Sequence, residues 1–308
     1  MVLRAAIQCA ITFGLSYILV PLTVPLCRVT GALDVPDGVR KINTHPIPRL
    51  GGLGIYTAIV PVLLPLCLTS PTVGATLAAG GVLAICGVCD DTYGMPWQGK
   101  LISQIAAALC AIVISGIPSN ISLLGIFDLP VSGPLGFLFV LVRLVFTMNA
   151  VNFSDGLDGL AAGICTVALT CLSVYGAHNG KLTEGIAALI IAAAVVGFMP
   201  YNRYRARIFM GDTGSQFLGL AIAMLSLGTS RGGSFTLETS MFLAVPTLDT
   251  AAAVIRRIIK RKSPFSADKG HLHHLLLSIG VPHPDASHLL VALSALIALV
   301  TLFGILNG

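Results

Sequence analysis

Met-Asn-Ala-Val-Asn-Phe-Ser-Asp-Gly-Leu-Asp-Gly-Leu-Ala-Ala, residues 148–162, is the stretch around which this chain is organised. Polar side chains recur at every third position from Asn149 through Asn152 and Asp155 to Asp158, and long apolar runs lie on both sides. An ordinary polar loop between two membrane helices needs only one or two such groups. Acids at membrane depth are costly and usually functional. We therefore interpret this stretch as part of a site.

The composition is that of a membrane protein with several spans. The 308 residues are 55% hydrophobic and 10% charged, with a mean hydropathy of +0.91, whereas a soluble domain has about 25% charged residues. The apolar runs exceed the roughly ten residues of a barrel strand, which favours helices. We predict one all-α, polytopic membrane domain over residues 1–308 with about ten transmembrane helices and functional loops. The apolar segments are 3–26, 51–68, 74–89, 100–116, 134–151, 157–177, 182–200, 213–230, 238–255 and 286–306. The first segment has no small-x-small cleavage motif, so we expect a retained helix.

Positive charge predicts the orientation of these helices. Of the 18 Lys and Arg residues, Arg4, Lys181 and Arg231 lie on the side of the even-numbered links, and Arg143 lies inside the fifth segment. All the others lie in the links after odd-numbered segments, which the positive-inside rule places in the cytoplasm. We expect a multi-pass plasma-membrane protein with both termini outside. The outer link 117–133 is rich in turn residues and predicts a loop or hairpin.

Most acids fall on the same cytoplasmic side, and Asp90-Asp91 is an adjacent pair at the end of the third segment. Two neighbouring carboxylates repel each other, so a divalent cation or a proton is expected to reduce their charge. A charged stop at a helix end is the plainer alternative. The chain has no Asp-Asp-x-x-Asp motif, which disfavours a prenyl-diphosphate synthase.

A glycine-rich run, Phe-Met-Gly-Asp-Thr-Gly-Ser at 209–215, precedes the eighth segment. Its backbone and hydroxyl groups can face phosphate oxygens, and Asp212 can hold Mg²⁺. Taken alone, such a run is also typical of a helix N-cap. The run indicates a phosphate or metal site because the other acids lie on the same side of the membrane.

The ninth link combines cations with histidines. His271, His273 and His274 follow Lys269 and the basic stretch 256–262. Zinc would need a fourth ligand nearby, so the set is incomplete for that metal. Imidazoles beside cations suit phosphate binding better. Attraction to anionic lipid headgroups is an equally simple explanation of the basic stretch.

The first link, residues 34–52, also mixes cations with acids. His45 and Arg49 flank the two X-Pro turns, and a Gly-Gly pair follows that permits close backbone approach. Together the links describe a cytoplasmic pocket with acids for a metal and cations for phosphates. That is the outline of a phosphoryl-transfer site.

Five motifs together resemble the polyprenyl-phosphate N-acetylhexosamine-1-phosphate transferases, members of glycosyltransferase family 4. They run in order through roughly residues 28–280. The motifs are Pro-Ile-Pro-Arg-Leu-Gly-Gly, Asp90-Asp91, Asn-Ala-Val-Asn-Phe-Ser-Asp-Gly-Leu-Asp-Gly-Leu, Phe-Met-Gly-Asp-Thr-Gly-Ser and Ser-Pro-Phe-Ser-Ala-Asp-Lys-Gly-His-Leu-His-His. The last motif resembles the branch that uses UDP-N-acetylglucosamine for teichoic acid or O-antigen linkage units. The phospho-MurNAc-pentapeptide transferase, with its His-His-His-Phe-Glu type of loop, is the alternative within the family.

The resemblance implies the residues that act at the reacting phosphates. By position, Asn152 and Asp212 would contact Mg²⁺, with Mn²⁺ as the alternative metal. Asp90 would keep the lipid phosphate ionised or lie near its attacking oxygen, and Asp91 would support it. Lys100 would neutralise phosphate charge.

The resemblance also implies the residues that hold the substrates. Asp155 and Asp158 would line the nucleoside side, and Phe209 would stack on uracil. The sugar diphosphate would be held by the histidine motif. The expected substrate-binding residues are Asp155, Asp158, Phe209, His271, His273, His274, Lys269, Arg49 and His45, where the family pattern leaves the role of His45 open.

The expected reaction moves N-acetylglucosamine-1-phosphate from UDP-GlcNAc to undecaprenyl phosphate and releases UMP. Direct attack is expected, and a covalent aspartyl-phosphate route through Asp90 or Asp91 stays open. The expected partners are the UDP-sugar, polyprenyl phosphate and membrane lipid, with no nucleic acid, and a homodimer is left open. A lipid-linked sugar transporter or flippase is the rival from another class, although such proteins place their charges near the bilayer midplane. A non-catalytic scaffold leaves the clustered acids unexplained.

Overall fold

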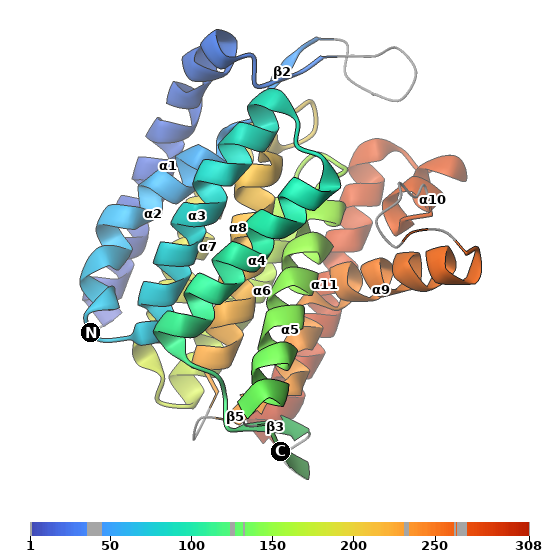
Figure 1. Ribbon diagram of the computed structural model, residues 1–308. Coiled ribbons are helices and arrows are strands. Elements are labelled where there is room, and N and C mark those ends of the chain that lie inside the picture. The colour runs from blue at the N-terminus through green and yellow to red at the C-terminus, as the bar shows by residue number, and fades with distance from the viewer. Residues whose placement is uncertain are drawn as a thin grey trace.

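A computed structural model describes residues 2–35, 45–123, 127–131, 133–230, 234–261, 263 and 270–307. Within these ranges the chain is a bundle of long helices with short strands at its two ends (Figure 1). The helices are α1 (Val2–Thr30), α2 (Gly51–Cys67), α3 (Pro71–Tyr93), α4 (Trp97–Ser115), α5 (Gly133–Ser154), α6 (Leu160–His178), α7 (Leu182–Asn202), α8 (Gly211–Gly228), the 3₁₀ helix η1 (Leu237–Leu243), α9 (Ala244–Ile259), α10 (Leu272–Ser278) and α11 (His283–Asn307). The strands are β1 (Leu33–Asp34), β2 (Ile47–Pro48), β3 (Asn120–Leu123), β4 (Phe127–Pro130) and β5 (Ser234–Thr236).

The helices have the length and apolar character of membrane spans, which confirms the predicted all-α polytopic class. Among the described helices, α1, α3, α4, α5, α6, α7 and α11 are long and apolar enough to cross a membrane. The helix α2 is apolar and 17 residues long. Helices suit this setting because each satisfies its own backbone hydrogen bonds.

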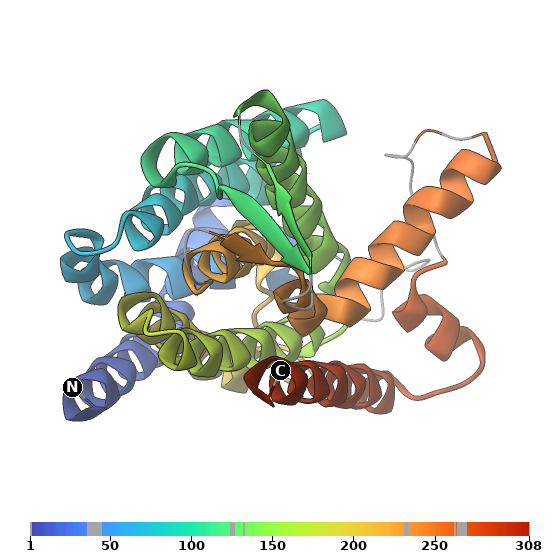
Figure 2. The ribbon, with the colours of Figure 1, turned by 90° about the horizontal axis from the view of Figure 1, so that it is seen from below.

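The ninth apolar segment differs from the expected single span. It divides into η1 and α9, and α9 projects sideways from the bundle (Figures 1 and 2). Leu243 between them leaves α-helical geometry at φ −115° and ψ 33°. Pro246 then lies in the first turn of α9, where its missing N–H costs nothing. The outward face of α9 is apolar, with Ile255 and Ile259 56% and 75% exposed, as expected for a helix in contact with lipid.

The helix α8 lies at the centre of the bundle, with every residue from Gly211 to Ser226 buried. Close packing around its first turn depends on glycine. A Cβ on Gly52 would lie 2.1 Å from the backbone nitrogen of Gly214, and one on Gly87 would lie 2.5 Å from the Cα of Thr213. The ends of α2 and α3 can therefore touch the start of α8, which brings distant polar residues together.

The opposite end of the bundle contains the small sheet and both chain ends (Figure 1). Antiparallel β3 and β4 form the hairpin predicted for 117–133, and β5 pairs parallel to β3. Arg143, unexplained by the sequence, donates from its Nη1 to the Ala223 carbonyl at 2.9 Å and from its Nη2 to Ser226 Oγ at 2.6 Å. Its guanidinium also lies 4.2 Å from the ring centroid of Phe235. A cation at the C-terminal end of α8 complements the helix dipole there.

Candidate active site

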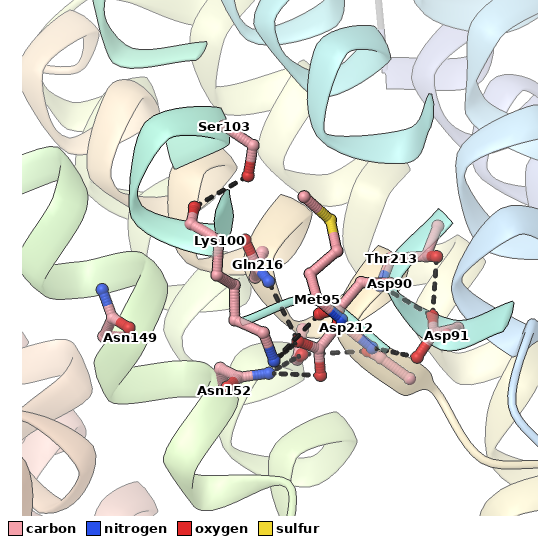
Figure 3. Close-up of polar contacts among 12 residues, drawn as sticks. Asp90, Asp91, Met95, Lys100, Ser103, Asn149, Asn152, Asp212, Thr213 and Gln216 are labelled. Atoms are coloured by element: carbon pink, nitrogen blue, oxygen red, sulfur yellow. Dashed lines mark hydrogen bonds and ion pairs between the residues drawn. The ribbon is translucent and has the colours of Figure 1, made fainter. Parts of the chain in front are cut away.

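The polar cluster at the centre of the site is contributed by four helix ends (Figure 3). Lys100, at the start of α4, lies between two carboxylates. Its Nζ is 2.9 Å from Asp90 Oδ2 at the end of α3, and it also contacts Asp212 Oδ2 at the start of α8. Asn152, near the end of α5, donates from its Nδ2 to Asp212 Oδ1 at 3.0 Å and to Ser215 Oγ at 2.9 Å. The predicted grouping of these four residues is therefore present in the structure.

Asp91 is adjacent to Asp90 but points to the backbone of α8. Its side chain is 0% exposed. It accepts hydrogen bonds from the Asp212 N–H at 3.0 Å, the Thr213 N–H at 3.1 Å and the Thr213 hydroxyl at 2.8 Å. Met210, the residue at the N-cap position of α8, makes no capping bond from its own side chain. Asp91 therefore caps α8 from another helix and fixes the turn that contains Asp212.

Backbone pairing places Arg49 and Phe209 beside this cluster. Phe209 donates to the Pro48 carbonyl at 2.8 Å, and the Gly51 N–H donates back to the Phe209 carbonyl at 3.0 Å. Gly211 follows with φ +70°, and a Cβ there would lie 2.1 Å from the Arg49 carbonyl. Only glycine fits this turn, which sets the direction of α8.

A polar cavity of about 410 Å³ opens next to the cluster. Seven of the predicted site residues line it: Arg49, Asn152, Asp155, Asp158, Phe209, Asp212 and His274. The lining also includes Asp34, Asn202 and His283, which the motifs did not single out as site residues. These seven predicted residues therefore line one cavity, whose lining comes from seven separate parts of the chain.

The turn between α5 and α6 forms one wall of this cavity. The Gly159 N–H donates to Asn202 Oδ1, and Asp158 Oδ2 accepts from the Ala206 N–H, both at 3.1 Å. Burial raises the pKa of the Asp155 carboxyl well above its usual range, and the negative charges of Asp212 and Asp91 raise it further. A carboxyl with this pKa favours neutralisation by a proton or a cation.

The histidine motif divides into buried and cavity-lining members. His271 and His273 are 5% and 4% exposed, whereas His274 lines the cavity. Burial, together with the charges of His274 and His271, lowers the pKa of His273 to about 4, so its imidazole is neutral near pH 7. Lys269 lies outside the described residues. His45 is exposed and lies outside the cavity lining, so its role stays a prediction.

The donor set can be tested against Mg²⁺ and zinc. In the described part of the chain, no group of three His, Cys, Asp or Glu residues is arranged to hold a metal. Asp90 Oδ2 is buried, and no described residue gives it a well-oriented hydrogen bond. Lys100 Nζ lies 2.9 Å from this oxygen as its ion-pair partner. Asp212 and Asp90 offer carboxylate oxygens. The Asn152 amide turns its Nδ2 toward Asp212, so it would offer its Oδ1 to a metal there only with the amide turned over. These few ligands fit Mg²⁺, which takes one or two carboxylates and completes its shell with water and phosphate oxygens.

A line of amides behind Asp212 was not predicted from the sequence. Gln216 Nε2 donates to Asp212 Oδ2 at 3.1 Å, and Gln104 Nε2 donates to Gln216 Oε1 at 3.3 Å. Asn149 Nδ2 then donates to Gln104 Oε1 at 2.8 Å. The spacing of four residues between Asp212 and Gln216 was the available signal, because such residues share a helix face.

Comparison with known proteins agrees with the motifs. The model of the family described as "Glycosyl transferase family 4" matches residues 73–230. A probable undecaprenyl-phosphate N-acetylglucosaminyl 1-phosphate transferase of Bacillus subtilis (strain 168) is 33% identical over 278 residues, covering 86% of this chain and 75% of the relative. A decaprenyl-phosphate N-acetylglucosaminephosphotransferase of Mycolicibacterium smegmatis is 34% identical, covering 83% and 71%. An undecaprenyl-phosphate alpha-N-acetylglucosaminyl 1-phosphate transferase of Escherichia coli (strain K12) is 28% identical, covering 89% and 76%. With these matches and the clustered motif residues, the chain belongs to glycosyl transferase family 4.

Proposed function

We propose that this protein transfers N-acetylglucosamine-1-phosphate from UDP-GlcNAc to a polyprenyl phosphate, with undecaprenyl phosphate as the expected acceptor, and releases UMP. One observation carries the proposal. The Lys100, Asn152 and Asp212 cluster lies between a polar cavity and a smaller hollow that leads to an apolar groove, and Asn152 lines both the cavity and the hollow. A reaction between a water-soluble nucleotide sugar and a membrane lipid phosphate needs this junction.

The polar cavity suits the nucleotide sugar. Phe209 offers an aromatic face for uracil, and Asp155 and Asp158 offer acceptors for the nucleoside. Arg49 and His274 line the same cavity and suit the diphosphate. UDP-sugar binding here therefore combines one stacking surface with groups of both charge signs.

The apolar groove suits the lipid. A hollow of about 220 Å³ beside Lys100 shares Leu101, Asn149 and Phe153 with an apolar groove of about 360 Å³. That groove in turn shares Val142 and Phe146 with a second one of about 600 Å³. The hollow and the two grooves run along α5 for roughly 25 Å, at about 1.5 Å per helical residue. A polyprenyl tail along it would leave the phosphate beside Lys100.

The reaction then follows from placement. An oxygen of the lipid phosphate attacks the phosphorus that carries the sugar, the bond between this phosphorus and the bridging oxygen breaks, and UMP leaves with that oxygen. Lys100 neutralises charge on the two anionic reactants, and Asp90 keeps the lipid phosphate ionised near the attacking oxygen. Asp212, Asn152 and Asp90 would hold Mg²⁺, which offsets phosphate charge when bound. The structure supports direct attack more than a covalent route through Asp91, whose oxygens are engaged with α8.

The active site would face the cytoplasm. The α7–α8 link, with its cations, leads into the start of α8, which contacts the end of α3, and both chain ends lie toward the other end of the bundle (Figure 1). This distribution supports the orientation expected from the positive-inside rule, with both termini outside. A transporter would instead place its charges near the bilayer midplane.

The test is UMP release by purified protein in detergent with UDP-GlcNAc, undecaprenyl phosphate and Mg²⁺. We expect turnover without a membrane gradient, loss on chelation of the metal, recovery on adding Mg²⁺, and loss in Asp212→Ala. The control is Asp285→Asn, which removes an exposed carboxylate at the start of α11. Wild-type turnover by Asp212→Ala would remove Asp212 from the site. A panel of UDP-GlcNAc, UDP-GalNAc and UDP-MurNAc-pentapeptide decides the donor, and absence of UMP release with all three would refute the proposed function.

A further inference from the structure

A buried pair outside the proposed reaction centre connects α9 with the histidine motif. Asp249 of α9 and His271 are 7% and 5% exposed. His271 Nδ1 lies 2.8 Å from Asp249 Oδ2, and the Leu272 N–H donates to Asp249 Oδ1 at 3.0 Å. Both carboxylate oxygens are therefore engaged with the start of α10. A buried carboxylate needs such partners to offset its loss of hydration.

The two bonds determine how α10 begins. His271 occupies the N-cap position of α10, but its own side chain makes no capping bond. Asp249 supplies the missing acceptor from another helix and brings negative charge to the first turn. It also fixes the imidazole, because a carboxylate partner keeps a proton on Nδ1 and directs Nε2 away. Asp249 thus controls both the backbone and the side-chain orientation of this motif.

The ordering continues from His271 to the cavity. The rings of His271 and His273 are stacked, with centroids 5.8 Å apart and an interplanar angle of 9°. His273 packs against Gly156, where a Cβ would lie 2.5 Å from His273 Nε2. His274 follows, with its ring centroid 4.2 Å from that of His273, and lines the polar cavity. A displaced His271 would therefore displace His274.

The same helix forms a wall of the apolar groove. Thr250 and Arg257 of α9 line the groove of about 360 Å³ together with Phe153. The Phe153 ring lies 5.5 Å from the His271 ring and 5.8 Å from the Arg257 guanidinium. A lipid in this groove would therefore touch the helix and the ring that support the histidine motif.

We propose that Asp249 is a positioning residue that holds His271 and, through it, the cavity-lining His274, so that lipid in the groove along α9 strengthens binding of the nucleotide sugar. The inference rests on the proposed assignment of the polar cavity to the donor and the apolar groove to the acceptor. Asp249 and His271 act as one unit, with Asp249 touching neither substrate.

The test compares Asp249→Asn, His271→Asn and the double variant with wild type and with Asp285→Asn. Asparagine at 249 keeps the size of the side chain but removes its charge and favours the opposite imidazole tautomer. We expect the donor KM to rise about tenfold, the loss typical of one charge-assisted hydrogen bond, with kcat within threefold of wild type. The acceptor KM at saturating donor should rise by the factor by which the lipid tightens donor binding, because coupling between two sites is reciprocal. The double variant should be no worse than the worse single variant, because neighbours acting as a unit are non-additive.

A direct binding measurement separates this idea from a purely structural role. An unreactive analogue of UDP-GlcNAc, with a methylene group in place of the oxygen that bridges the two phosphorus atoms, is titrated into the protein with Asp212 intact, with and without undecaprenyl phosphate. We expect the lipid to tighten donor binding, and Asp249→Asn to abolish that tightening. If Asp249→Asn does not fold, the same titration with His271→Asn decides, because the coupling must then be lost in that variant. Unchanged donor KM or unchanged coupling overturns the inference. Wild-type UMP release remains the separate test of the proposed function.

Discussion

Substitution of Asp91 distinguishes a chemical role of this residue from a structural one. Asp91→Asn keeps the size of the side chain and one acceptor oxygen. In its better orientation that oxygen still accepts from the two Thr213 donors, while the new NH₂ group meets the Asp212 N–H instead of accepting from it. One charge-assisted bond is lost, a buried N–H is left unsatisfied, and the anion at the start of α8 disappears.

The expected cost follows from these three losses. Hydrogen bonds to charged groups contribute about 1.5–3 kcal/mol, and an anion at a helix N-terminus about 0.3–2 kcal/mol. We expect Asp91→Asn to lower the free energy of unfolding by roughly 3–5 kcal/mol, which corresponds to a Tm lower by roughly 5–10 °C for a chain of this size.

The assay is thermal unfolding in detergent, followed by UMP release well below the Tm of the variant. Turnover there should stay within about tenfold of wild type, since the Asp212 turn shifts but its carboxylate remains. Asp128→Asn, which removes a carboxylate from the exposed strand β4, should leave the Tm unchanged. A wild-type Tm combined with lost turnover would refute the capping role and make Asp91 a chemical participant.

Two further predictions concern pH and packing. Because the pKa of His273 is about 4 in the fold and 6.5 as its ordinary value, the unfolded chain binds the extra proton between these values. Stability should therefore fall by about 2 kcal/mol from pH 7 to pH 5; His273→Gln should flatten this dependence of Tm, and an unchanged slope would contradict it. Gly52→Ala, whose Cβ would lie 2.1 Å from the Gly214 nitrogen, should lower Tm by several degrees and reduce turnover. Gly14→Ala, with nothing within 4 Å, is its matched control, and equal effects of the two would refute the packing argument.

The sequence predicted more of the site than of the packing behind it. Asn152 and Asp212 were grouped from their motifs, and the structure brings them within 3.0 Å. The link between Asp249 and His271 had no local signal, because the partners are 22 residues apart on separate elements. The contacts of Arg143 also had no local signal, because its partners on α8 are 80 and 83 residues away.

By itself the sequence determined the class of protein, its ten apolar segments and the chemistry of its polar links, because hydropathy and motif composition are local properties. It also set apart the stretch 148–162 from its surroundings. Only the tertiary structure decided which partner or cavity each of those polar residues contacts. Asn152 meets Asp212, Asp155 and Asp158 line the cavity, and Asn149 joins an amide chain through Gln104. The physical reason is that glycine contacts around α8 let separate helix ends converge. Local periodicity in the sequence does not predict contacts between distant segments.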